Sequence, residues 1–199
     1  TTRGAAHRAD AAALARRGAL VEAIAAHLGA LTPSGSVDVA EGLVAAGERA
    51  TAQAAPDEAA RWFQRALEEG AATPDPAAIM SELGLSQAAL RDPSAIEHLR
   101  EALAGGHDPR RQAQTATALA DVLVMSGRWT EAFQLTTTYR RQLGSDADAL
   151  AQLAAVELML AAYSPALAAA SDLEPERLAH LTEGGTWAAR ALAAALAVT

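Results

Sequence analysis

Small and large apolar residues recur along this chain with a helical spacing and a long repeat. An alanine is followed four residues later by a larger residue and, three further on, by another small one. The clearest copies are Ala59–Phe63–Ala66 and Ala95–Leu99–Ala102. Weaker copies begin at Ala23 and Ala132, which gives intervals of 36, 36 and 37 residues. These positions share one face of an α-helix, so the pattern predicts four related helices that neighbours approach closely.

A second small position lies upstream of the last three copies. Gly47, Gly84 and Ala120 recur at intervals of 37 and 36 residues, each directly after Ala or Leu. We interpret it as the point where the first helix of a pair meets the second. Seven large residues share this inter-helix face and are predicted to be buried: Phe63, Leu67, Leu83, Leu99, Leu103, Leu119 and Leu123.

Helix starts and stops follow the same register. Asp75, Asp92 and Asp108 each precede a proline, which suits an N-cap followed by the first helical position. Glycines such as Gly70 and Gly127 fall where helices should end. Helices are therefore predicted over 5–17, 20–31, 37–54, 57–70, 76–90, 93–104, 109–126, 129–143, 146–162, 165–170, 175–182 and 186–198.

Composition supports an all-helical chain and narrows its chemistry. Hydrophobic residues make up 51% of the 199 residues but aromatics only 4%, too few for a β-sandwich or barrel. There is no cysteine for a disulfide or thiolate metal site. The longest apolar stretch, 187–198, is too short to span a bilayer, and no signal peptide is evident, so we expect no membrane contact and a cytoplasmic protein.

The net charge and the absence of lysine argue against two activities, nucleic-acid binding and ATP binding. The net charge is −8, which repels a phosphate backbone, so we expect no direct contact with nucleic acid. All sixteen basic residues are Arg, and without Lys the chain has no P-loop for ATP. The Arg and Ala bias is typical of a high-GC bacterial genome.

The 36-residue unit resembles the tetratricopeptide repeat, which has a small residue in its first helix and Ala-x₃-aromatic-x₂-Ala in its second. Residues 40–73 have the family's length, but Leu43, Met80 and Ala116 replace its first-helix Trp. The resemblance implies an all-α fold, a right-handed superhelix of antiparallel helix pairs (an α-solenoid). We expect one helical-repeat domain over 1–199, with pairs over about 5–31, 37–70, 76–104 and 109–143, degenerate or capping helices over 146–199, and a longer parent protein.

Several segments narrow the resemblance further. Residues 7–28, 54–67, 97–103 and 126–132, in this order, are similar to the helical-repeat region of large ATP-binding LuxR-family transcriptional regulators of actinobacteria, relatives of the maltose-regulon activator. That resemblance implies a regulatory sensor and scaffold. Its partners would be other domains of the same polypeptide and a small-molecule or protein inducer, with oligomers allowed. ATP and DNA would bind to separate domains, so no cofactor is expected in this segment. The alternative is a freestanding tetratricopeptide adaptor that binds a partner peptide.

No catalytic constellation is apparent, and we expect no enzymatic activity. Glu97/His98/Glu101 and Glu176/His180 could each supply two metal ligands, but surface charge is the commoner explanation, and no metal site is predicted. Trp62 and Trp129 are interpreted as packing residues. Arg140–Arg141 is interpreted as a solvated pair near a helix end.

A partner groove is predicted from the tetratricopeptide register, in which first-helix positions facing away from the second helix line the concave wall. The wall has three carboxylates and no basic residue, which favours a neutral or cationic ligand, or a helix from another domain; exposed faces of ordinary helices are the alternative. The predicted residues are Glu41, Val44, Glu48, Thr51, Ser81, Leu85, Ala88, Gln114, Thr117, Asp121 and Met125.

Overall fold

The computed structural model describes residues 2–16, 21–70, 73, 75–105, 108–143, 146–174, 178–183 and 185–197. Over these residues every regular element is helical and there is no strand. The all-α prediction is therefore confirmed. The helices gather in two compact units, Thr1–Ala102 and Leu103–Thr199, which are described separately. The single continuous repeat domain stays a prediction.

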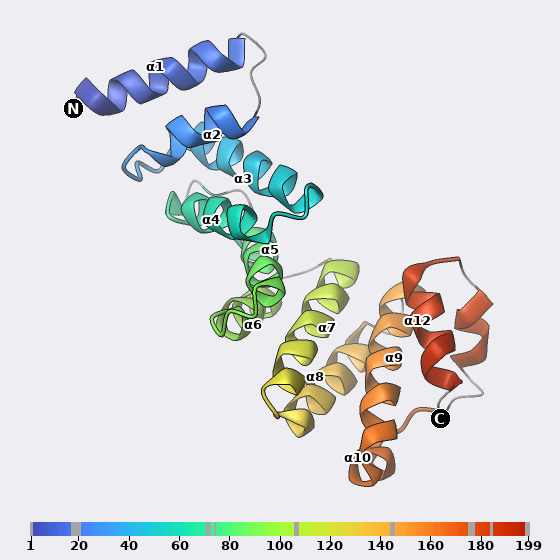
Figure 1. The fold of residues 1–199 in the computed structure, drawn as a ribbon. Helices are drawn as coiled ribbons and strands as arrows, with labels where there is room; N and C mark the ends of the chain where they lie inside the picture. Colours follow the sequence, from blue (N-terminus) through green and yellow to red (C-terminus); the bar gives the residue numbers. More distant parts are fainter. Residues whose placement is uncertain are drawn as a thin grey trace. The chain divides into compact units, whose positions relative to one another are not determined.

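The first unit contains α1 (Thr2–Arg16), α2 (Val21–Gly29), α3 (Val37–Ala52), α4 (Pro56–Leu67), α5 (Pro76–Ala89) and most of α6 (Ala95–Gly105) (Figure 1). Consecutive helices from α1 to α5 pack against one another. One apolar cluster joins α2 to α5, with Leu43, Phe63 and Leu83 almost completely buried at its centre.

The second unit contains α7 (Pro109–Met125), α8 (Trp129–Gln142), α9 (Ala147–Tyr163), α10 (Pro165–Ala170), the 3₁₀ helix η2 (Ala179–Glu183) and α12 (Trp187–Leu196). Helices α7, α8 and α9 contact one another, and α12 packs on α9 (Figure 1). An apolar cluster between α9, η2 and α12 is centred on Leu158 and Leu192. Where a helix was predicted over 175–182, the described part is the 3₁₀ helix, and 175–177 lie outside the described residues.

The predicted small positions lie where helices meet. A Cβ added to Gly47 would be 2.6 Å from Cε1 of Phe63, and one added to Gly84 would be 2.7 Å from Cδ2 of Leu99. Ala120, at the third copy, is fully buried. Of the seven residues predicted to be buried, six are; Leu67 is partly buried against the core. The inter-helix face is confirmed.

The helices α3, α5 and α7, which are the first helices of the last three pairs, also end in the same way. Ala54, Arg91 and Gly127 all have left-handed backbones, with φ of 55°, 57° and 75°, at intervals of 37 and 36 residues. In each case the next residue donates its N–H to a carbonyl five residues back: Ala55 to Ala50, Asp92 to Gln87 and Arg128 to Leu123, at 2.8–2.9 Å. This hydrogen bond closes the last turn of the helix. The repeat is thus present in the backbone as well as in the side chains.

Candidate functional site

The predicted groove residues of the first unit lie on α3 and α5 and differ in exposure. Glu41, Glu48 and Thr51 are exposed on α3. Val44 is half-buried against the core. On α5, Leu85 and Ala88 are half-buried, whereas Ser81 is only 1% exposed. Ser81 is therefore a buried residue of this helix.

The predicted groove residues of the second unit form a stripe along α7. Gln114, Asp121 and Met125 are exposed, and the Met125 side chain is 72% exposed. Thr117 is only 8% exposed, and its Oγ1 has no hydrogen-bond partner among the described residues. These four positions recur at three or four residues and therefore share a helix face.

Contacts at both ends show that α7 and α9 run in the same direction. At their starts, Nε of Arg110 lies 3.5 Å from Oδ2 of Asp146, and its Nη2 lies 3.7 Å from Oδ2 of Asp148. At their ends, Trp129, which follows α7 closely, packs its ring edge-on against Tyr163 with 6.0 Å between ring centroids. The α7 stripe therefore lies beside α9. We name the surface formed by the stripe and the adjoining exposed α9 residues the α7–α9 face.

This face is polar at one end and apolar at the other. Its polar end is a hollow of about 250 Å³ lined by Arg110, Gln114 and Asp148, among others. At the other end four large apolar side chains are exposed. Met125, Trp129, Met159 and Tyr163 have exposures of 72%, 37%, 54% and 73%. Flexible methionines beside aromatic rings adapt to partners of varied shape.

Asp121 lies between the two ends of the α7–α9 face. Desolvation of its carboxyl raises its pKa above the ordinary range. Within the described part of the chain this carboxyl has no ion pair and no hydrogen bond. A cation placed beside it would relieve the cost of holding an unpaired, partly desolvated charge.

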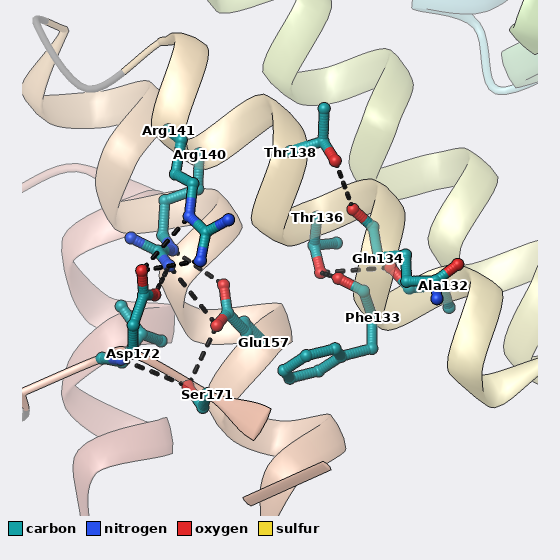
Figure 2. A network of polar contacts seen from close by, with 11 residues as sticks. Ala132, Phe133, Gln134, Thr136, Thr138, Arg140, Arg141, Glu157, Ser171 and Asp172 are labelled. Atoms are coloured by element: carbon teal, nitrogen blue, oxygen red, sulfur yellow. Dashed lines mark hydrogen bonds and ion pairs between the residues drawn. The ribbon is translucent and has the colours of Figure 1, made fainter. Parts of the chain in front are cut away.

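A polar network around the buried Glu157 joins α8, α9 and the segment after α10 in the second unit (Figure 2). Glu157 on α9 is fully buried and accepts hydrogen bonds from Nε of Arg140 at 2.7 Å and from Oγ of Ser171 at 3.0 Å. Arg140 also pairs with Asp172, and Nη2 of Arg141 donates to Oδ2 of Asp172 at 2.8 Å. The interpretation of Arg140–Arg141 as a solvated pair is wrong for Arg140, whose side chain is 11% exposed.

The network perturbs the ionisation of its members. Hydrogen bonds from Arg141, opposed by desolvation and reinforced by Arg140, lower the pKa of Asp172. The pKa of Arg140 is raised because its bonds to Glu157 and Asp172 outweigh the desolvation that would lower it. Since every charged member has a partner in the protein, we interpret the network as structural: it holds the segment after α10 against α8 and α9.

A comparable set of hydrogen bonds around a buried glutamate holds the loop before α3 in the first unit. Glu69 is 3% exposed and accepts hydrogen bonds from the backbone N–H groups of Ser34 and Ser36, at 2.9 and 3.1 Å. Arg65 donates to Oε1 of Glu69 at 2.8 Å. Desolvation would raise the pKa of Glu69, but these hydrogen bonds and the Arg65 charge outweigh it and lower the pKa.

The two candidate metal sites were Glu97/His98/Glu101 and Glu176/His180. Nδ1 of His98 lies 2.6 Å from Oε1 of Gln87, and Glu176 lies outside the described residues. In the described part of the chain no three His, Asp or Glu side chains are grouped so that they could hold a metal ion. None of the described helices has the length and apolarity needed to cross a membrane.

Comparison with known proteins gives no assignment: no protein-family model, no curated protein and no solved structure matches this chain.

Proposed function

We propose that this chain is a helical-repeat scaffold and sensor domain, in which antiparallel helix pairs stack into a right-handed superhelix of the tetratricopeptide type. The observation that carries the proposal is the recurring backbone and packing geometry. A close glycine contact in the first helix, at Gly47 or Gly84, is followed seven residues later by the left-handed cap, at Ala54 or Arg91. Units that repeat their mutual packing bury one another's faces and commonly serve as binding surfaces.

The parent protein is proposed to be a LuxR-family ATP-binding transcriptional regulator. The proposal is supported by the similar segments between residues 7 and 132, which occur in the same order as in that family. In such a protein this domain would relay an inducer signal to other domains of the same polypeptide, which bind ATP and DNA. A freestanding adaptor for a partner peptide is the second candidate. The exposed apolar end of the α7–α9 face suits a partner peptide as well as it suits another domain of a regulator.

The coding sequence on either side of this segment separates the two candidates. A regulator requires a P-loop upstream, with the Lys of Gly-x₄-Gly-Lys-Ser/Thr, and a helix-turn-helix downstream. Finding neither would contradict the regulator and leave the adaptor.

A double substitution in the full-length protein tests whether the predicted wall receives the signal. Glu48→Ala with Asp121→Ala removes two exposed carboxylates of the wall. The matched control is Glu97→Ala with Glu101→Ala, which removes two exposed carboxylates from α6. We expect the inducer-dependent change in reporter transcription to fall about tenfold in the first variant only, since a lost charge-assisted contact costs about 1.5–3 kcal/mol. Equal responses in both variants would contradict a role for the wall.

A further inference from the structure

A cavity in the first unit lies between α2 and α4. Its volume is about 660 Å³, which is in the range of small-molecule sites. The α2 side consists of small residues, Ala26, Gly29 and Ala30, and the α4 side carries the charged and aromatic ones. A Cβ on Gly29 would lie 2.9 Å from Cζ3 of Trp62. The small residues of α2 therefore let Trp62 close one side of the cavity.

Two of the charged groups in the cavity wall are already engaged. Nη2 of Arg65 donates to the carbonyl of Leu31 and to Glu69, both at 2.8 Å. Its Nε lies 3.7 Å from Oε2 of Glu68. Arg65 is therefore shared between Glu69 and Glu68, and the three groups together carry one net negative charge at this end of the wall.

The other two charged groups of the cavity wall are Arg61 and Glu58. The guanidinium of Arg61 lies 4.4 Å from the centroid of the Trp62 ring, and over the described residues neither it nor Glu58 makes an ion pair or hydrogen bond. They lie one turn apart on α4, about 4.5 Å along the helix axis. The cavity thus presents a cation stacked on the Trp62 ring and an anion one turn away, neither of them in an ion pair within the described residues.

Two hydrogen-bond donors on the cavity-lining residues of α4 are buried without an acceptor. Trp62 is 7% exposed, and its Nε1 has no acceptor among the described residues; the same holds for Nη1 of Arg65. Both donor atoms are buried, so the anionic group of a ligand is left to the exposed guanidinium of Arg61.

We propose that this cavity binds a small zwitterion of the α-amino acid class. Its carboxylate lies on Arg61, its ammonium group on Glu58, and its side chain against Ala26, Gly29 and Ala30. Arg offers a planar fork of donors that matches a carboxylate. A simple anion or cation would leave one of the two wall charges unpaired. This inference goes beyond the proposed function and does not depend on the α7–α9 face.

The indole N–H signal of Trp62 reports on the cavity directly. In the chain with Trp129→Phe and Trp187→Phe, Trp62 is the remaining tryptophan, so its signal is unambiguous in a proton–nitrogen NMR spectrum. The twenty standard amino acids are added one at a time at about 10 mM, which detects sites as weak as millimolar. We expect at least one to shift the signal in a saturable manner. The amide of that amino acid and its deaminated acid should each bind about tenfold or more weakly. No shift with any of the twenty, or equal binding of the amide, overturns the proposal.

Substitutions in the cavity wall provide a second test of amino-acid binding, with the same NMR signal. Arg61→Gln and Glu58→Gln should each weaken binding about tenfold or more, because each removes one charge-assisted contact. Ala30→Leu should abolish binding by filling the cavity. Asp57→Asn removes a neighbouring exposed charge that does not line the cavity and should leave binding unchanged. Circular dichroism confirms that each variant is folded. Unchanged binding in folded Arg61→Gln, or equal weakening by Asp57→Asn, overturns the proposal.

Discussion

At Gly47 the missing side chain decides how closely α3 and α4 pack. Three atoms of the Phe63 ring lie within 2.6–2.8 Å of the position that a Cβ would take, and Phe63 is completely buried. Gly42 on the same helix has a different neighbour. Its Cβ would meet Cδ1 of Leu28 at 2.6 Å, the flexible tip of a partly buried side chain. One helix thus contains a glycine against a rigid ring and a glycine against a movable group.

These two glycines allow a matched test of the inter-helix contact. Gly47→Ala and Gly42→Ala both gain about 1 kcal/mol of helix propensity. Only Gly47→Ala must displace a buried ring, which costs about 1–3 kcal/mol. We therefore expect the free energy of unfolding of Gly47→Ala, measured in urea, to lie below that of Gly42→Ala by about that amount. Equal stabilities would show that α3 and α4 separate freely at this point.

Single-residue patterns predicted burial well for apolar positions and poorly for polar ones. The large residues on the repeat face are buried because their spacing fixes the face. Ser81 and Thr117 were assigned to an open wall but are 1% and 8% exposed. Their polarity gave no sign of burial, which depends on helices contributed by distant parts of the chain. Glu157 is the clearest such case, because its partners Arg140 and Ser171 become neighbours only in the folded unit.

At the scale of elements, the helix start was predicted correctly at two of the three Asp–Pro caps. Side chains of Asp75 and Asp108 accept hydrogen bonds from the N–H groups of Ala78 and Arg111, as expected of N-caps. Asp92 instead bonds the N–H of Ser94, and α6 begins two residues later than predicted. At the start of α9 the side chain of Asp146 accepts a hydrogen bond from the N–H of Ala149.

The repeated helix ends predict opposite effects for two substitutions. A left-handed backbone costs a residue with a side chain about 1–2 kcal/mol but costs glycine almost nothing. A Cβ on Gly127 would meet no atom within 4 Å, so Gly127→Ala should lower stability by about 1 kcal/mol through the backbone alone. Ala54→Gly should raise stability by about 0.5 kcal/mol, after the greater entropy of unfolded glycine is subtracted. Thermal unfolding of both variants measures this. A loss of stability in Ala54→Gly would mean that its turn opens in solution.

At the scale of the whole chain, carboxylates respond to folding in two opposite ways. Folding lowers the pKa of Asp146, and the largest cause is the hydrogen bond from the N–H of Ala149. It also lowers the pKa values of Glu69 and Asp172. Each of these three contributes stability above its unfolded pKa, and that contribution is lost as the pH falls through the lower folded pKa. Folding raises the pKa of Asp121 by desolvation, so this residue destabilises the folded chain at neutral pH and ceases to do so when it is protonated.

Acid unfolding of two isosteric variants separates these effects. Asp172→Asn should be less stable than the parent chain near neutral pH, and the difference should begin to shrink near pH 4, the unfolded pKa of Asp, and be lost as the pH falls through the lower folded pKa. Its size should be at most about 1 kcal/mol, because Asp172 is 51% exposed and solvent screens its ion pairs. Asp121→Asn should be more stable than the parent near neutral pH, and this gain should also disappear in acid. Urea unfolding from neutral pH down to about pH 3 measures both differences. If Asp121→Asn is instead the less stable variant at neutral pH, its carboxylate has a partner in the folded chain, and the α7–α9 face does not hold an unpaired anion for a cationic ligand.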